Sequence, residues 1–219
     1  MDLAEAMRCA PTSRRYTDQP VAREALVRAL DLARFAPSGG NRQGWRVVAV
    51  EDAERRRSLA DLYLPHWRAY TEQTGAARVL ADPGSFDARA VRMITAADDY
   101  ARSLADVPVH LVVGVQIEDL AVTDAGLDRQ SIVGGASVYP FVQNLLLALR
   151  AEGLGAAMTT LLVPAEREVC ELLQIPAGIA LAAHIGVGHR ADPWPKQLAR
   201  NPVPAFAFSE RWGEPLGSS

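Results

Sequence analysis

Two short segments gather arginines, amides, hydroxyls and glycines at points where regular structure is expected to stop. The first is APSGGNRQ, residues 36–43, and the second is MRCAPTSRRY, residues 7–16. Pro and Gly at a helix-to-strand junction are ordinary turn chemistry, so the polar side chains are what suggests a binding role. Neither segment holds a nucleophile, paired carboxylates or a set of metal ligands. Such segments could hold a phosphorylated cofactor that supplies its own chemistry.

Familiar catalytic motifs are missing from the sequence. No GxGxxG follows the first expected strand, and GVGHR at residues 186–190 lacks the helix that a phosphate loop requires. A P-loop and a GxSxG elbow are also absent, and the four histidines are too scattered to predict a metal site. We expect His110 and His184 to be core histidines bonded to backbone groups. Residues 98–100, DDY, are expected to form a solvated helix face.

Composition indicates the class of protein. The 219 residues are 49% hydrophobic, which allows a sizeable core, and the net charge of −3 argues against nucleic acid as a partner. The most apolar stretch, residues 138–155, is interrupted by polar residues and is too short to span a membrane. Cys9 and Cys170 are expected to be thiols in a reducing cytoplasm, and acids stand where a signal peptide would be basic. We therefore expect a cytoplasmic protein without a membrane partner.

Apolar periodicity predicts about six helices and three to five strands. Helices are expected over residues 2–9, 22–36, 52–62, 64–80, 87–104, 131–152 and 164–173, and strands over 45–50, 107–117 and 179–188. Pro65 can stand in a first turn, and Pro140 either kinks its helix or marks the true start. Because strands and helices do not alternate regularly, we expect a single α+β domain over residues 1–219.

The order of these motifs resembles the nitroreductase family of FMN-dependent oxidoreductases. Residues 14–52 are similar to its N-terminal signature, which ends in APSGxNxQxW. Residues 142–160 resemble the second signature, a long helix that runs into Gly-Leu-Gly. Residues 172–188 resemble the third signature, and LARNPV at 198–203 resembles the closing arginine motif. The four motifs stand in the family's order and spacing, whereas residues 60–130 match weakly.

The resemblance implies an architecture and a set of partners. The fold would be a central mixed or antiparallel sheet flanked by helices, in a homodimer whose C-terminal tails are swapped onto the partner. FMN would bind at the subunit interface, NAD(P)H would donate a hydride to flavin N5, and an electron-poor small molecule would accept it in ping-pong turnover. The acceptor would be a nitroaromatic, a quinone or a similar compound, and no side chain need act as a general base.

The resemblance also implies which residues bind FMN. The loop with Pro37, Ser38 and Gly39 would pack on a flavin ring held mainly by the other subunit, and a Gly-rich turn permits that close approach. Arginines would clamp the phosphate, and the backbone N–H of Gly155 would stabilise reduced flavin near N5 and O4. The implied cofactor-binding residues are Arg8, Thr12, Arg14, Arg15, Pro37, Ser38, Gly39, Asn41, Gln43, Leu154, Gly155 and Arg200.

Two positions depart from the family pattern at the phosphate. Many members carry an Arg two residues before Thr12 and a Lys two residues before Arg200, where this chain has Ala10 and Leu198. Arg8 and Lys196 are candidates to replace them.

Two other readings of the function stay open. One is a specialised member of the family that dehalogenates, dehydrogenates or breaks down flavin. The other is a flavin-binding protein without turnover, a store or sensor.

Tyr63, Trp67 and Tyr70 either line the mouth of the pocket or pack between helices.

Overall fold

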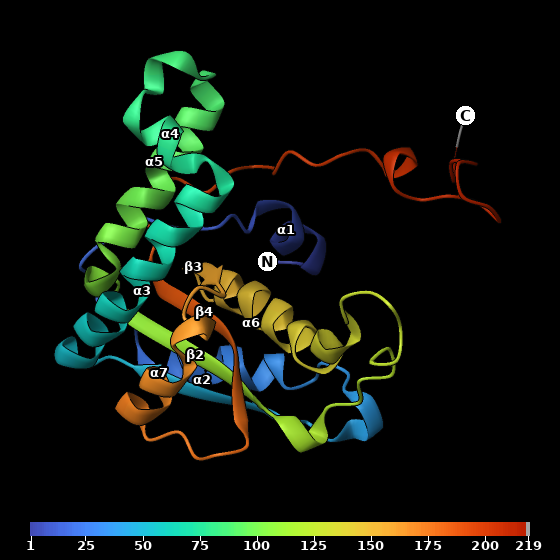
Figure 1. The fold of residues 1–219 in the computed structure, drawn as a ribbon, viewed down its shortest axis with the longest axis horizontal. Coiled ribbons are helices and arrows are strands. Elements are labelled where there is room, and N and C mark those ends of the chain that lie inside the picture. Colours follow the sequence, from blue (N-terminus) through green and yellow to red (C-terminus); the bar gives the residue numbers. More distant parts are fainter. Residues whose placement is uncertain (218–219) are drawn as a thin grey trace.

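Four antiparallel strands form the central sheet of the computed structural model, which describes residues 1–217. Their order across the sheet is β1-β2-β4-β3, and helices cover both of its faces (Figure 1). The strands are β1 (Trp45–Val50), β2 (Val109–Gln116), β3 (Leu154–Thr159) and β4 (Ile179–His189). The expected α+β class with a helix-flanked antiparallel sheet is confirmed. The last two residues of the expected domain, 218–219, lie outside the described residues.

Strand β2 is buried on both faces. On one face, Val109, Leu111 and Val113 join a core with helices α2 (Arg23–Ala33) and α6 (Tyr139–Ala151). Alternate residues of the strand point to the opposite face, because successive side chains of a strand alternate. This position explains the nearly continuous β-branched run, which is typical of a strand covered on both sides.

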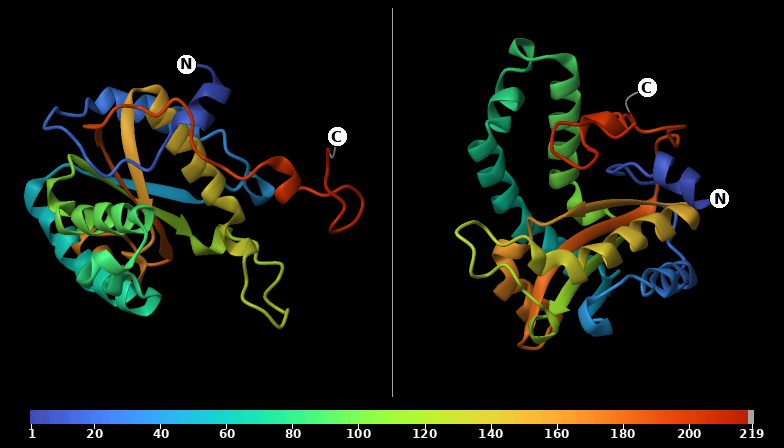
Figure 2. Two further views of the ribbon diagram at one scale, coloured as in Figure 1. Left: turned by 90° about the horizontal axis from the view of Figure 1, so that it is seen from above. Right: turned by 90° about the vertical axis from the view of Figure 1, so that its right-hand side faces the viewer.

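The opposite face of the sheet is covered by α3 (Ala53–Thr74), α5 (Ala88–Arg102) and α7 (Glu166–Leu173). The short helix α4 (Ala76–Ala81) connects α3 to α5. These three helices, α3 to α5, rise beyond the sheet as an arm (Figures 1 and 2). The N-terminal helix α1 (Leu3–Cys9) lies against α6.

Helix α3 is continuous where two helices meeting near Pro65 were expected. Pro65 removes one backbone hydrogen bond from the helix interior. Leu59, Tyr63 and Trp67 are buried at four-residue intervals on both sides of it, and their packing holds the helix together. The helix ends at Gly75, whose φ of 77° favours glycine.

The expected solvated face at residues 98–100 is wrong for two of its three residues, since Asp99 alone is exposed. Asp98 is buried and accepts hydrogen bonds from Trp67 Nε1 at 2.8 Å and Arg102 Nε at 2.6 Å. Tyr100 is buried as well. These residues lie on the side of α5 that packs against α3, and two donors compensate the desolvation of the carboxylate.

Helix α6 begins at Tyr139, so the expected start at residue 131 is wrong and the alternative start near Pro140 is correct. Pro140 stands in the first turn, where its missing N–H costs no helical hydrogen bond. The preceding residues Val133–Ser137 form a 3₁₀ turn. After the helix, Gly153 adopts a φ of 79°, as expected for a glycine that terminates a helix.

His110 and His184 are buried, as expected, but their partner is different. Nδ1 of His110 and Nε2 of His184 lie 2.7 Å apart, so the two rings bond to each other across β2 and β4. The expectation that backbone groups satisfy both was therefore wrong. The pairing depends on strand order, which the sequence around either histidine does not encode.

The C-terminal tail leaves the body of the molecule after β4. It contains one short 3₁₀ turn, Val203–Ala205, and extends well beyond the sheet and helices (Figure 1). None of the helices in residues 1–217 is both long enough and apolar enough for a membrane crossing.

Candidate functional site

The segment around Thr12 runs along the outer edge of β3. The N–H of Ser13 donates to the carbonyl of Ala156 at 2.8 Å, and Thr12 forms a parallel bridge with the same residue. These bonds extend the sheet by a short fifth strand-like stretch. They fix the chain on both sides of Thr12 and Arg14.

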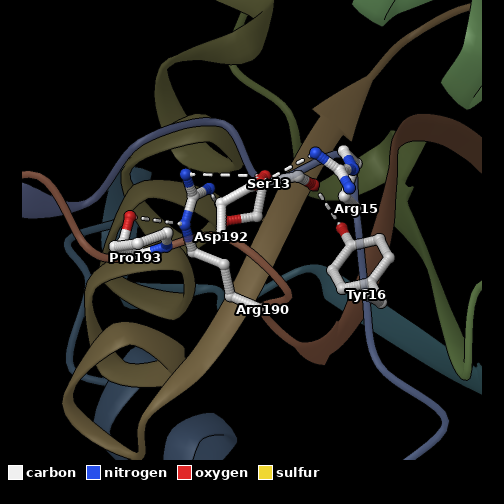
Figure 3. Close-up of polar contacts among 6 residues, drawn as sticks. All are labelled: Ser13, Arg15, Tyr16, Arg190, Asp192 and Pro193. Carbon is white, nitrogen blue, oxygen red and sulfur yellow. Dashed lines mark hydrogen bonds and ion pairs between the residues drawn. The ribbon is translucent and has the colours of Figure 1, made fainter.

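A cluster of side chains clamps this segment to the end of β4 (Figure 3). Ser13 is fully buried, and its Oγ accepts a hydrogen bond from Arg190 Nη1 at 3.0 Å. The hydroxyl of Tyr16 reaches the carbonyls of Ser13 and Gly186, and burial raises the Tyr16 pKa well above its usual value. Arg15 forms an ion pair with Asp192 at 3.0 Å. The cluster orients the segment that carries Thr12 and Arg14.

Gly155 lies directly beneath this segment. A Cβ atom at Gly155 would stand 2.7 Å from Ser13 Cβ and 3.2 Å from Arg190 Cβ, so only glycine allows the two chain segments to approach this closely. Gly155 is buried in the structure. Its position beside Ser13 supplies a structural reason for the glycine in addition to the implied contact with flavin.

A first hollow, of about 470 Å³, opens between the Thr12 segment, α6, β3 and the tail. Thr12, Leu154 and Arg200, three of the implied cofactor residues, line it together with Ala10 and Leu198. We call it the arginine hollow, because the charged side chains among its lining residues are Arg150 and Arg200 and none of the lining residues is acidic. This environment suits an anion such as a phosphate.

A second hollow, of about 310 Å³, adjoins the first and shares Thr12 and Met158 with it. We call it the tyrosine hollow, since Tyr63, Tyr70 and Tyr100 line it. Its other lining residues include Arg14, Trp67, Thr159 and Thr160. The two adjoining hollows suit an elongated ligand with an anionic end and a flat aromatic end.

The aromatic residues on α3 have features of both readings. Tyr63 and Trp67 are buried in the core, and they also line the tyrosine hollow. Tyr70 is 45% exposed at its edge. Burial raises the pKa of Tyr63 and of Tyr100, so both phenols stay protonated at neutral pH. They can donate hydrogen bonds but do not act as bases there.

The implied loop residues lie elsewhere in the chain. We call Pro37, Ser38, Gly39, Asn41 and Gln43 the loop group. None of them lines either hollow. The N–H of Gly39 donates to Ser137 Oγ at 3.0 Å, just before the start of α6. The arginine hollow is lined along α6 from Gln143 to Arg150, and Gln143 follows Ser137 by six residues.

The loop group has a defined internal structure. The N–H of Gln43 donates to Ser38 Oγ at 3.0 Å, and Gln43 Nε2 lies 3.2 Å from Asn41 Oδ1. Asn41 and Gln43 adopt φ values of 55° and 52°, which are uncommon outside glycine. Pro37, Gly39, Asn41 and Gln43 are exposed. The loop is therefore a built and open surface rather than part of an enclosed site in its own chain.

Three basic residues that the sequence suggested for FMN binding lie outside both hollows. Arg8 is exposed at the end of α1, and its carbonyl accepts from the N–H of Leu198 at 2.8 Å. Arg15 is paired with Asp192, and Lys196 is exposed. None of the three lines the arginine hollow or the tyrosine hollow.

Sequence reasoning missed several residues that the fold brings to the site. Arg190 follows β4 directly within GVGHR, which was considered only as a phosphate loop. Thr159 is the last residue of β3, which begins within Gly-Leu-Gly, and Thr160 follows it. Arg150 and Tyr100 were assigned to helices without a role. Arg190 and Thr160 could have been recognised because each directly follows a strand. Nothing in the local sequence distinguished Arg150 or Tyr100.

Within the part of the chain that the structure describes, no three His, Cys, Asp or Glu side chains come together as a metal site.

Comparisons with known proteins agree on one family. The chain is 30% identical over 203 residues to a 5,6-dimethylbenzimidazole synthase of Rhodospirillum rubrum, covering 87% of this chain and 80% of that protein. It is 30% identical over 193 residues to an iodotyrosine deiodinase of Thermotoga neapolitana, covering 88% and 90%. A crystal structure of oxidised iodotyrosine deiodinase bound to FMN and 3-iodo-L-tyrosine superposes with a TM-score of 0.65 at 26% identity, covering 92% of this chain and 96% of that one. The sequence model of the nitroreductase family matches residues 11–189, and the chain therefore belongs to the nitroreductase family.

Proposed function

We propose that this protein is an FMN-dependent oxidoreductase that passes a hydride from NAD(P)H to an electron-poor small molecule. One observation carries the proposal: the arginine hollow and the tyrosine hollow adjoin at Thr12 and Met158 in a chain of the nitroreductase family. When bound, FMN supplies the centre that accepts and donates the hydride. The protein's part is to bind, orient and exclude water.

Each end of the combined hollow suits one end of the cofactor. Arg200 and the hydroxyl of Thr12 suit the phosphate, because a guanidinium and a hydroxyl both donate to phosphate oxygens. Arg14 lines the tyrosine hollow rather than the arginine hollow. We therefore assign it to the polar part of the flavin or the ribityl chain, where its charge favours the anionic reduced form.

A homodimer would complete the site. None of the loop group lines either hollow of its own chain, and all of it except the half-buried Ser38 is exposed, so a second copy would bring a loop to the flavin ring. Leu3, Met7, Leu32 and Phe35 expose large apolar surface on and after α1 and α2, and surfaces of this kind mark interaction sites. The projecting tail can reach a partner in the same assembly.

A specialised reaction is a second candidate. Both curated relatives at 30% identity carry names of specialised enzymes rather than general reductases. Such an enzyme would use O₂ or a dedicated substrate, and NAD(P)H oxidation would then be slow.

Cytoplasmic location and the absence of a nucleic-acid partner stay predictions from composition.

The first experiment is an absorbance spectrum of the purified protein with identification of the released chromophore. We expect yellow protein that releases FMN, and loss of the colour in the Arg14→Ala, Arg200→Ala double variant. Steady NAD(P)H oxidation with a nitroaromatic or quinone would support the general reductase. FMN binding with turnover only on a dedicated substrate would favour the specialised enzyme. Colourless protein that cannot be reconstituted with FMN would refute the proposal.

A further inference from the structure

Arg150 lies in the last turn of α6 and lines the arginine hollow. Its guanidinium carbon stands 3.8 Å from the centre of the Trp194 ring, in the tail segment that closes the hollow. A guanidinium over an indole at this distance makes a cation–π contact, which helps to hold the side chain in place. This contact uses the face of the indole ring and does not occupy the N–H donors of the guanidinium in hydrogen bonds.

Those donors lack protein partners in residues 1–217. Arg150 Nε is buried without a hydrogen bond, and no carboxylate among the described residues forms an ion pair with Arg150. The nearby Glu152 cannot neutralise it, because that carboxylate is held by Arg28 at 2.7 Å and has a lowered pKa for this reason. A buried donor without a partner costs free energy, so its presence points to a ligand.

Arg190 provides an internal contrast. Its guanidinium carbon also faces Trp194, at 5.6 Å, but its N–H groups are used by Ser13 Oγ and the carbonyl of Pro193. Arg190 also lies 3.9 Å from Asp192. Of the two arginines on this indole, Arg150 is therefore the one with capacity for an anion.

The arginine hollow needs such a residue. Ala10 and Leu198 line it with apolar side chains at the two positions where many family members are basic. Arg8 and Lys196, the candidates from the sequence, do not line it. Arg150 is the lining cation that sequence reasoning did not consider.

We propose that Arg150, oriented by Trp194, binds the FMN phosphate and replaces the basic residues missing at Ala10 and Leu198. The inference rests on the proposed function. It differs from a structural role, in which a cation at the end of α6 only complements the helix dipole. A structural role predicts changes in stability, whereas phosphate binding predicts a loss specific to ligands that carry the phosphate.

The test compares FMN with riboflavin, which lacks the phosphate, by quenching of flavin fluorescence on the apoprotein. For Arg150→Gln we expect the Kd for FMN to rise about 10–100-fold, as for loss of a charge-assisted hydrogen bond. The Kd for riboflavin should change less than about twofold. Arg150→Lys should lie between, and Trp194→Leu should raise the FMN Kd by a smaller factor because the charge remains. The matched control is Arg167→Gln, an arginine on α7 whose side chain is 81% exposed.

Equal loss of FMN and riboflavin affinity, or no loss of either, in Arg150→Gln would overturn the inference while leaving the proposed function intact. Wild-type protein that binds neither flavin would instead refute the proposed function. If Arg150→Gln does not fold, Arg150→Lys decides the question, since it retains the stem and charge but not the guanidinium donors. In that variant, an FMN affinity equal to wild type would count against the inference.

Discussion

The residues implied as the cofactor site divide into two regions with different construction. We call the first region the β3 group: Thr12, Arg14, Leu154 and Arg200 line the two hollows, and Gly155 lies on β3 beside Ser13. The loop group is mostly exposed, is braced by its own hydrogen bonds and by Ser137, and lines neither hollow. An enclosed half and an open half suggest that a working site takes one half from each of two chains.

The largest expected effect comes from mixing two inactive variants. Arg14→Ala removes a charge from the β3 group, and Ser38→Leu removes the hydroxyl that holds Gln43 in the loop group. Each homodimer should lose most of its turnover. A heterodimer purified through two different tags should recover roughly half of the wild-type activity, because one of its two sites combines an intact half from each chain.

The mixing experiment can also contradict a site shared between two chains. If each loop serves the hollows of its own chain, both sites of the heterodimer carry one defect and no activity returns. The control is a heterodimer of Arg14→Ala with Arg200→Ala. Both changes lie in the β3 group, so each of the two sites contains one altered β3 group, whichever chain supplies the loop. The control should therefore stay inactive.

Gly155→Val should have the next largest effect, and it acts on the β3 group alone. Its Cβ would stand 2.7 Å from Ser13 Cβ and would push the Thr12 segment away from β3. Overpacking of this kind costs about 1–3 kcal/mol of unfolding free energy, and FMN affinity should fall with it. Urea unfolding and flavin titration measure the two losses.

The control for that prediction lies on the loop side. A side chain at Gly126 would meet no atom within 4 Å. Gly126→Val should therefore change the unfolding free energy by less than about 0.5 kcal/mol. Equal losses in both glycine variants would mean that the tight contact at Ser13 is not what Gly155 provides.

Three features could be predicted from the sequence: the fold class, the family, and the strands near residues 45–50, 107–117 and 179–188. They follow from apolar periodicity and motif order, which are local patterns. The end of helix α3 at Gly75 rather than near Pro65 could not be predicted, since packing of Tyr63 and Trp67 overrides the proline. The burial of Asp98 depends on donors from Trp67 and Arg102. One of these lies 31 residues away along the chain.

The candidate site shows the same limit. Thr12 and Arg200 were found through motifs, whereas Arg150 and Tyr100 reach the hollows only through the packing of α6 and α5. The partner of His110 is His184 on another strand, 74 residues away. Contacts between distant elements follow from topology, and a single sequence does not specify them residue by residue.

Acid should distinguish the two regions by its effect on stability. On the β3 side, burial lowers the pKa of His110 to about 4 and also lowers the pKa of His184, which pairs with Thr159 of β3. On the loop side, hydrogen bonds from the N–H of Ile132 and the hydroxyl of Ser131 lower the pKa of Asp124 to about 2. Asp124 thus organises the segment that leads to Ser137, the partner of Gly39.

The signs of these shifts set the pH window. An unfolded histidine titrates near pH 6.5, so below that pH the unfolded state takes up protons that the buried pair refuses, and stability falls until about pH 4. Between pH 6.5 and 4.5 the wild type should lose about 2 kcal/mol of unfolding free energy for each of the two histidines that stays neutral, or about 4 kcal/mol for the pair. Urea unfolding of His184→Gln should show a shallower loss, whereas Asp124→Asn should keep the wild-type slope because Asp124 stays ionised throughout this range. A flattened slope in Asp124→Asn but not in His184→Gln would place the acid-sensitive region on the loop side and break the comparison.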